Sequence, residues 1–249
     1  MNRTTWLSAV NGVALGLMIL FNYWANALPL NNQTTGEISD RLNILFTPAD
    51  YTFSIWGLIY LILIIWVVML FLSPQGAKVT NEIGIWFVIS CALNMSWLFF
   101  FHYEYFFLSL IVMFMLLYSL FIIYRRLLSE DFWLLWRIPF SIYLAWISVA
   151  TIINIAIVFS AHHLHLLLTP EAWTVLFIWL SMIWALWFMY QRTDLLYPAV
   201  FIFSLIGIAN NRPEYPEIAF SAWAMAGVLV IVLLYHLTPM VSDLSKLKK

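Results

Sequence analysis

The chain has 249 residues, of which 64% are hydrophobic, 18% are aromatic and 9% are charged. So small a share of polar residues cannot coat a water-soluble domain of this length, and a net charge of -1 gives no basic footprint for nucleic acid. The composition therefore indicates an integral membrane protein that has the lipid bilayer as a partner and no nucleic-acid partner.

Apolar runs bounded by charges, prolines or polar clusters predict about eight transmembrane helices. They lie at residues 6–27, 51–73, 82–101, 105–124, 133–159, 172–190, 195–209 and 217–237. The seventh run is short and contains Pro198, so a re-entrant segment is the alternative there. We expect an all-α, polytopic membrane bundle with a five-helix part over residues 1–160 and three additional helices over residues 161–249.

The charges next to these runs predict the orientation. If all eight runs cross, nine Lys and Arg residues fall on the side of both termini, and only Arg41 and Arg212 fall on the other side. The positive-inside rule then places both termini in the cytoplasm, and the cell membrane is the expected location. A cleaved signal peptide over residues 1–27 is the competing interpretation, but this run is longer than a usual signal core.

Between the first two runs lies the longest polar stretch, LPLNNQTTGEISDRLNILFTPADYTFSIWG, which we interpret as an exterior loop with a functional role.

The sequence lacks the residues that several classes of membrane protein need for their chemistry. Lysines occur only at positions 78, 246, 248 and 249, outside the runs, which excludes a retinal Schiff base. The runs also contain no paired aspartates and no His-Glu-x-x-His motif, so intramembrane aspartyl and zinc proteases lack their chemistry, and no phosphate-binding glycine loop gives a sign of a built-in ATPase.

Nine of the 14 tryptophans fall into two groups by their position in the runs. Interfacial positions, with the indole near the lipid headgroups, are expected for Trp6, Trp24, Trp133, Trp136, Trp173 and Trp187, because all of them lie near run ends. Trp56, Trp97 and Trp146 instead stand next to small or polar residues within a run and could face the interior of the bundle.

The stretch YLAWISVATIINIAIVF carries one such tryptophan. Tyr143, Trp146, Ala150 and Asn154 are spaced by three, four and four residues, so they share one helix face. Ala150 leaves either a close helix contact or a notch for a flat ligand. For Asn154 alone, a hydrogen bond between helices is the simpler interpretation. The third run repeats the pattern of an amide and an indole in CALNMSWLFFF.

These motifs resemble the TspO family, also called tryptophan-rich sensory proteins, translocator proteins or peripheral benzodiazepine receptors. YLAWISVATIIN is similar to the fifth-helix signature of that family, LNMSWLFFF to its third-helix Leu-Asn-x-x-Trp and Phe pair, and IWGLIY to its second-helix Trp and Tyr. The resemblance covers about the first 160 residues. It departs from the family where prolines are missing before Trp56 and Tyr143 and after Trp97, and no acidic residue is evident in the fourth helix.

The resemblance implies a receptor or carrier that binds a flat apolar ligand, such as a porphyrin or another tetrapyrrole, in an aromatic pocket within the membrane. The implied ligand-binding residues are Trp56, Tyr60, Asn94, Trp97, Phe100, Tyr143, Trp146, Ala150 and Asn154. The aromatic rings would stack on the ligand, and Asn94 and Asn154 would orient it. No cofactor is required, and haem or porphyrin would be a ligand.

Two other functions stay open. A permease for a small apolar solute is suggested by the three extra helices and the short seventh run. A porphyrin-degrading enzyme is disfavoured because the motifs offer no acid, base or nucleophile. The extra helices could also cover a face used for dimerisation, so a homodimer remains an alternative.

For three remaining features a structural role is the simpler interpretation. His162, His163 and His165 could bind a metal or an incoming haem, but a polar interfacial turn is favoured and we predict no metal site. His102 and Glu104 are interpreted as capping helix ends in a tight loop. Cys91, the single cysteine, is expected to be a buried thiol.

Overall fold

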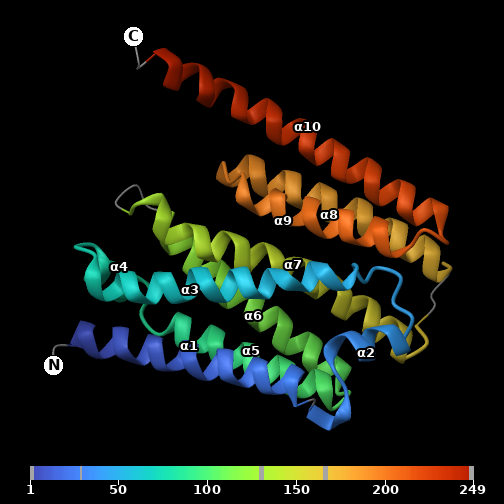
Figure 1. Cartoon of the computed structure of the whole chain (residues 1–249), viewed down its shortest axis with the longest axis horizontal. Coiled ribbons are helices and arrows are strands. Elements are labelled where there is room, and N and C mark those ends of the chain that lie inside the picture. The colour runs from blue at the N-terminus through green and yellow to red at the C-terminus, as the bar shows by residue number, and fades with distance from the viewer. Residues whose placement is uncertain (1–2, 29, 129–131, 165–167, 247–249) are drawn as a thin grey trace. The chain divides into compact units, whose positions relative to one another are not determined.

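The computed structural model describes residues 3–28, 30–128, 132–164 and 168–246, with side chains as far as residue 238. Within these ranges the chain is helical and forms no strand (Figure 1). The helices are α1 (Arg3–Ala27), α2 (Thr35–Arg41), α3 (Ile55–Leu72), α4 (Gly76–Ile83), α5 (Trp86–His102), α6 (Phe106–Arg126), α7 (Leu134–Ala161), α8 (Pro170–Arg192), α9 (Leu196–Asn211) and α10 (Pro216–Lys246), with short 3-10 turns η1 (Leu30–Asn32) and η2 (Asp50–Ser54).

Each of the eight predicted runs forms a helix, which confirms the polytopic helical fold class. Six segments of the described chain are long and apolar enough to cross a membrane. α5 reaches that length only together with α4, from which it is bent by 61°. α9 has 16 residues, a length of roughly 24 Å, which is short of a hydrocarbon core about 30 Å thick. The count of eight crossings therefore stays a prediction for α9.

The bend between α4 and α5 was not foreseen, although a glycine marks it. Gly84 ends α4 with a φ of 55° and a ψ of -126°, a backbone conformation that is disfavoured for residues with a side chain. The chain turns there, and α5 begins two residues later at Trp86.

The chain folds as two compact units. Unit 1 contains residues 1–44 and 53–166, and unit 2 contains residues 45–52 and 167–249. The sequence analysis divided the chain once, at residues 160 and 161. In the structure a short piece of the loop after α2 also groups with the C-terminal helices.

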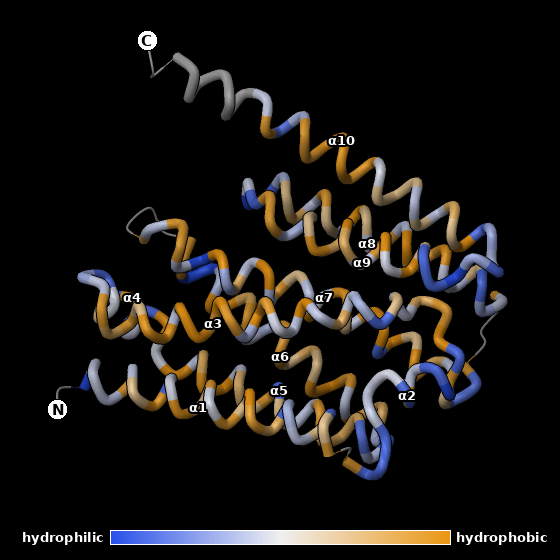
Figure 2. Tube along the Cα trace, in the orientation of Figure 1, coloured by the Kyte–Doolittle hydropathy of each residue, from blue (hydrophilic) through white to orange (hydrophobic). Residues whose placement is uncertain are grey.

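In unit 1, five helices pack in a ring. α1 packs on α5, α5 on α6, α6 on α7, α7 on α3, and α3 returns to α1. Polar residues gather at the helix ends and connections, while the helix middles are apolar, as Figure 2 shows. This distribution is the one expected for a bundle that spans lipid, where backbone polar groups are satisfied within each helix.

In unit 2, α8, α9 and α10 pack on one another. Asp194 caps the start of α9, since its carboxylate accepts hydrogen bonds from the backbone N–H groups of Leu196 (3.0 Å) and Tyr197 (3.2 Å). The Tyr197 ring stacks on Phe188 with 3.7 Å between ring centroids, and its hydroxyl accepts a hydrogen bond from the Trp184 indole at 2.8 Å.

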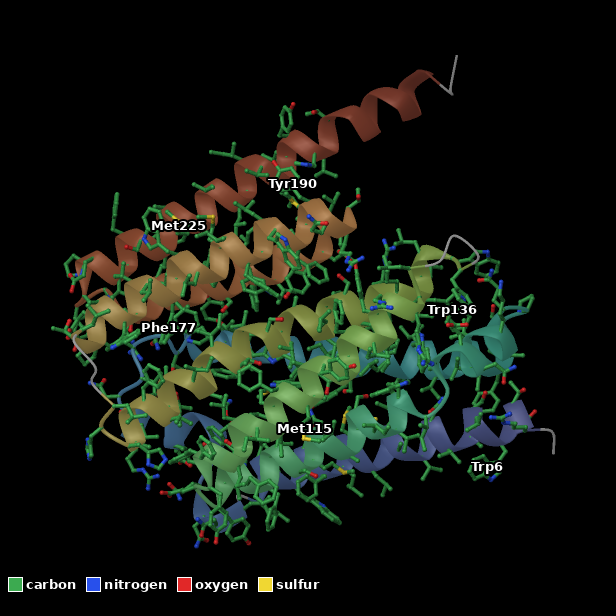
Figure 3. The ribbon with its side chains drawn as sticks, turned by 180° about the vertical axis from the view of Figure 1, so that it is seen from behind. Trp6, Met115, Trp136, Phe177, Tyr190 and Met225 are labelled. Atoms are coloured by element: carbon green, nitrogen blue, oxygen red, sulfur yellow. The ribbon has the colours of Figure 1, made fainter. Side chains whose placement is uncertain are left out.

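Most tryptophans expected at the interface are exposed near helix ends. Trp6 and Trp187 are 53% and 47% exposed, and Figure 3 shows Trp6 at the beginning of α1. Trp24 and Trp133 are also about half exposed. Trp136 is different. It is 0% exposed, and its indole donates a hydrogen bond to the Gln75 side-chain oxygen at 2.9 Å, so the interfacial prediction was wrong for this residue.

Candidate functional site

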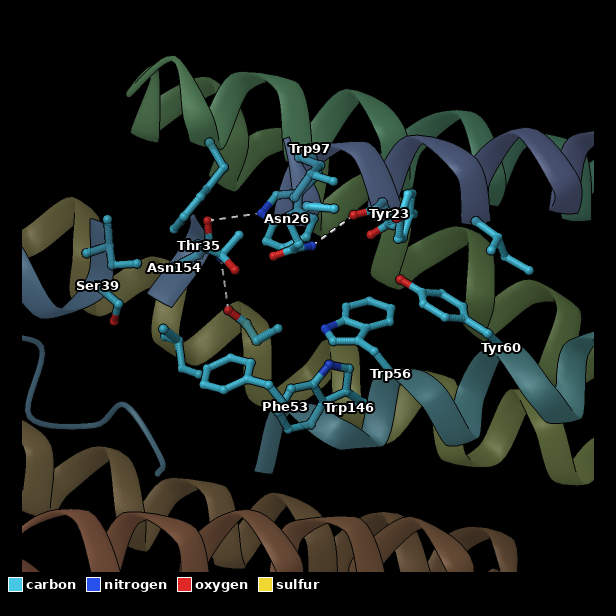
Figure 4. A pocket seen from close by; sticks show the side chains of 18 residues that line it. Tyr23, Asn26, Thr35, Ser39, Phe53, Trp56, Tyr60, Trp97, Trp146 and Asn154 are labelled. Atoms are coloured by element: carbon cyan, nitrogen blue, oxygen red, sulfur yellow. Dashed lines mark hydrogen bonds between the residues drawn. The ribbon is translucent and has the colours of Figure 1, made fainter. Parts of the chain in front are cut away.

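Unit 1 contains a cavity of about 580 Å³. Residues of α1, α2, η2, α3, α5 and α7 line it, whereas α6 contributes none of the described lining (Figure 4). The lining consists of Ile19, Asn22, Tyr23, Asn26, Ala27, Thr35, Ser39, Phe53, Trp56, Tyr60, Trp97, Leu98, Phe101, Trp146, Ala150, Ile153, Asn154 and Ile157.

Four aromatic rings form one wall of the cavity. Trp56 meets Trp146 edge-on at 6.3 Å, and Phe53 meets Trp146 edge-on at 5.9 Å. Tyr60 stacks on Trp56 at 5.7 Å. Edge-to-face pairs hold rings rigidly at right angles, so this wall offers both a ring face and ring edges to a ligand.

The cavity wall carries no ionisable acid or base apart from tyrosine hydroxyls among the described residues. Its polar atoms are those of amides, hydroxyls and indoles. The buried indole N–H of Trp146 finds no hydrogen-bond partner in the described part of the chain, and Figure 4 shows the indole nitrogen of Trp56 facing the open part of the cavity. An indole only donates, so any ligand atom that meets it must accept a hydrogen bond.

One set of amides ties α1, α5 and α7 together beside the cavity. Asn22 donates from its side-chain nitrogen to the Asn94 oxygen at 2.8 Å, and Asn94 donates to the Tyr143 hydroxyl at 2.9 Å. Asn22 also donates to the Met18 carbonyl at 2.9 Å. In lipid such bonds between helices satisfy polar groups that would otherwise be costly to bury.

A second set joins α5, α6 and α7. The Asn154 oxygen accepts from the Trp97 indole at 3.3 Å and from the Ser109 hydroxyl at 3.1 Å. The Asn154 nitrogen donates to the Ala150 carbonyl at 3.1 Å. Both ends of this amide are therefore engaged within the protein, and the interhelical interpretation of Asn154 accounts for its hydrogen bonds.

Six of the nine sequence-predicted site residues line the cavity, namely Trp56, Tyr60, Trp97, Trp146, Ala150 and Asn154. The other three lie outside the lining. Asn94 and Tyr143 are 0% exposed and bond to each other, and Phe100 packs edge-on against Phe99 at 5.7 Å. Its neighbour Phe101 lies one turn after Trp97 and takes the place in the lining that was predicted for Phe100.

The sequence analysis expected the polar loop to have a functional role, but it named no residue of α1 or of that loop as part of the site. Asn22 and Asn26 are amides in an otherwise apolar run, a pattern that marks functional positions in a membrane helix and could have been used. Thr35 and Ser39 are four residues apart on α2 and so share a face. α2 itself begins with a capping box, in which Thr34 and Glu37 exchange hydrogen bonds.

A polar latch holds the segment around α2 to the connection between α5 and α6. Glu104 accepts hydrogen bonds from the Arg41 guanidinium at 2.7 Å and from the Gln33 amide at 3.0 Å. Asn31 donates to the His102 carbonyl at 3.0 Å. Glu104 has a φ of 62°, which is uncommon for a residue other than glycine or asparagine. In this conformation its carboxylate accepts the hydrogen bonds from both Arg41 and Gln33.

Residues 8–235 match the sequence model of a family described as TSPO-like protein. The chain belongs to the TSPO-like protein family. No curated protein and no solved structure matches it. The suspected TspO relationship is thereby confirmed, and the match continues past residue 160, so that α8, α9 and most of α10 of this TSPO-like protein lie within the matched region.

Its membership in the family and its long apolar helices show that this TSPO-like protein is an integral membrane protein. Its orientation and its host membrane stay predictions. The described residues contain no group of three His, Cys, Asp or Glu side chains that could hold a metal ion, and His165 lies outside them. His102 is 0% exposed with its ring nitrogen bonded to the Leu98 carbonyl at 2.8 Å. Cys91 is buried and free, as expected.

The hydrogen bonds of Glu104 in the latch predict that the stability of this TSPO-like protein depends on pH. The Gln33 amide, followed by the Arg41 guanidinium, lowers the pKa of Glu104 below its ordinary value of 4.5. Stability from these bonds is therefore present above about pH 4.5 and is lost as the pH falls through the lowered pKa. Because the pair is partly exposed to water, it contributes at most about 1 kcal/mol.

We expect Glu104→Gln to lower the thermal midpoint slightly at pH 6, and we expect the difference from the wild type to be smaller at pH 3, because the carboxylate becomes protonated as the pH falls through its lowered pKa. The measurement is the difference between the two midpoints at each pH. A difference of the same size at both values would show that the charge of Glu104 does not matter.

Proposed function

We propose that the cavity of unit 1 binds a flat, apolar molecule of the tetrapyrrole class, with an uncharged part of the ligand buried in the cavity. The observation that carries this proposal is a space of about 580 Å³ walled by aromatic rings and free of charged side chains among the described lining. Pockets for small molecules typically have 300–1,000 Å³ and a few placed polar groups.

The geometry supports binding by burial and stacking. Trp56 and Trp146 stand nearly perpendicular, at 88°, so a planar ligand that stacks on one ring meets the edge of the other. Stacking and apolar burial do not depend on ionic strength, since no charge pair is screened. The carboxylates of a porphyrin would therefore have to remain outside the lining described here.

A titration with protoporphyrin IX tests the proposal. The protein is placed in nanodiscs, and the absorbance of the porphyrin is followed at low and high salt. Trp146→Ala removes a ring of the aromatic wall and should weaken binding about tenfold or more, because a buried aromatic contact is lost. Trp179→Ala is the matched control, since Trp179 lies on α8 in unit 2 and is 47% exposed.

Unchanged affinity in Trp146→Ala, or equal losses in both variants, would contradict binding at this cavity. Affinity that falls steeply with added salt would contradict the uncharged mode of binding. Stability of each variant is checked by thermal unfolding, so that a loss of fold is not taken for a loss of the site.

A further inference from the structure

Asn11 is a buried amide on α1 that lies apart from the cavity lining. It is 0% exposed, and neither its side-chain nitrogen nor its side-chain oxygen has a hydrogen-bond partner among the described residues. The other buried asparagines of unit 1, Asn22, Asn94 and Asn154, all form hydrogen bonds. A buried amide without a partner destabilises the fold, and the cost is greatest where no bulk water is near. Asn11 therefore requires a partner that the described side chains do not supply.

The bonds of α1 to its neighbours show which part of the bundle Asn11 faces. α1 packs on both α4 and α5. Ser8 and Thr80 share a hydrogen bond at 2.9 Å, and Asn22 donates to Asn94 at 2.8 Å. Each of these bonds joins residues that are 72 positions apart, one on either side of Asn11 along α1. The register of α1 against α4 and α5 is therefore the same at both levels.

This register places Asn11 beside the bend between α4 and α5. The same interval of 72 makes Asn11 level with Ile83, the last residue of α4, which is also 0% exposed. α5 begins at Trp86, and no side chain caps its first turn. The first N–H groups of a helix have no partner within that helix, and a break in a membrane helix is tolerated where the freed groups are buried in protein or meet water. The amide of Asn11 thus lies next to backbone groups that also need a partner.

Trp66 of α3 supplies a further unpaired donor at this level. It is 1% exposed, and its indole N–H has no hydrogen-bond partner in the described part of the chain. Its ring contacts Phe87, in the first turn of α5, with 4.9 Å between ring centroids. α1 meets α3 at Gly12, where a Cβ atom would lie 3.4 Å from Val67. Because these two residues directly follow Asn11 and Trp66 in the sequence, the amide and the indole lie at one level of the bundle interior.

We propose that ordered water binds inside unit 1 between Asn11, Trp66 and the first turn of α5. The indole N–H of Trp66 only donates and the side-chain oxygen of Asn11 only accepts, so the occupant must both accept and donate hydrogen bonds. Water does both, and buried waters typically make about three hydrogen bonds to polar groups that lack other partners. An ion is a poorer match, because the side chains of Asn11, Trp66 and Ile83 carry no charge that would offset its dehydration.

This hydration site would join three helices at the level where the helix from α4 to α5 is interrupted. Water there would satisfy the amide of α1, the indole of α3 and the free N–H groups of α5 together. Neither Asn11 nor Trp66 lines the cavity, so the site does not depend on the proposed ligand.

Transfer of magnetisation from water in an NMR experiment tests the site in the wild-type protein. With the protein in nanodiscs, cross peaks with water should appear at the indole N–H of Trp66 and at the side-chain amide of Asn11. The rotating-frame experiment separates bound water from hydrogen exchange, because the two give cross peaks of opposite sign. Trp136 is the internal control. It is 0% exposed and its indole already donates to Gln75 at 2.9 Å, so it should show no cross peak with water.

Three variants assign the water to Asn11. Asn11→Leu replaces the amide with an apolar side chain of similar size and should remove the water cross peak of Trp66. Asn11→Ser keeps a polar group and leaves room for water, so it should retain that cross peak. Ser8→Ala is the matched control on α1, one turn earlier, because Ser8 is buried but already paired with Thr80. It should leave the cross peak of Trp66 unchanged.

Absence of water cross peaks at both Asn11 and Trp66 in the wild-type protein would overturn the inference, and this result does not depend on the folding of any variant. A cross peak of unchanged intensity at Trp66 in Asn11→Leu would also overturn it, since water would then bind without the amide. Thermal unfolding is the second readout. Removal of an unpaired amide from a dry site should raise the thermal midpoint, whereas loss of a bound water should leave it unchanged or lower it. A raised midpoint in Asn11→Leu would therefore contradict bound water.

Discussion

Ala150→Phe should abolish ligand binding while leaving the fold intact. Ala150 lines the cavity between Trp146 and Asn154 on α7 and is 8% exposed. Because Ala150 lines a cavity of about 580 Å³, the ring of a phenylalanine at this position can occupy the cavity without displacing a packed neighbour. We expect the affinity for protoporphyrin IX to fall about a hundredfold, which corresponds to roughly 3 kcal/mol.

The thermal stability of Ala150→Phe should not fall with its affinity for the ligand. Filling an internal space usually stabilises a protein, by about 0.5–2 kcal/mol in favourable cases, so the thermal midpoint of Ala150→Phe should equal or exceed that of the wild type. Loss of binding together with raised stability would separate occlusion of the site from unfolding.

The matched control is Ala92→Phe. Ala92 lies on α5 and is exposed, so the same substitution there adds a ring outside the cavity. Its affinity should equal that of the wild type. If Ala150→Phe binds the porphyrin as tightly as Ala92→Phe does, the ligand lies elsewhere and the proposed site is wrong.

The aromatic wall could be predicted because helical spacing is a local property. Trp146, Ala150 and Asn154 share a face by their intervals, and all three line the cavity. Spacing does not tell which neighbouring helix a face meets. Asn94 shares a face with Trp97, yet its partners are Asn22 and Tyr143, and it lies outside the lining.

The contact of Pro48 and Thr52 with Gly207 of α9 could not be predicted from the sequence. Pro48 and Thr52 read as ordinary loop residues, and Gly207 as a glycine inside a helix, because nothing local connects positions more than 150 residues apart. Only the tertiary fold brings the three together. Similarly, hydropathy located α5 and α9 correctly, but the bend at Gly84 and the short length of α9 depend on backbone geometry.

Asn94→Leu should destabilise unit 1 and leave ligand affinity nearly unchanged. Leucine has a similar size but neither accepts from Asn22 nor donates to Tyr143. The Tyr143 hydroxyl would then be left with only the Met18 sulfur, at 4.0 Å, among the interactions described for it. A buried polar group without its partner costs about 1–3 kcal/mol in soluble proteins, and bonds between membrane helices reach about 1.7 kcal/mol.

We therefore expect a loss of about 1–2 kcal/mol in the free energy of unfolding, measured by denaturant titration in a lipid-like environment. Asn22→Leu alone and combined with Asn94→Leu completes a double-mutant cycle, in which the loss in the double variant should be less than the sum of the single losses. Additive losses would mean that the two amides do not act as a pair.

The affinity measured in the same variants distinguishes two roles for Asn94. If this amide orients the ligand, as the sequence alone suggested, Asn94→Leu should weaken porphyrin binding at least as much as Trp146→Ala does. If it ties α1, α5 and α7 together, as its hydrogen bonds and its position outside the lining indicate, affinity should stay within about threefold while stability falls. A stable Asn94→Leu protein that no longer binds the porphyrin would restore the first role.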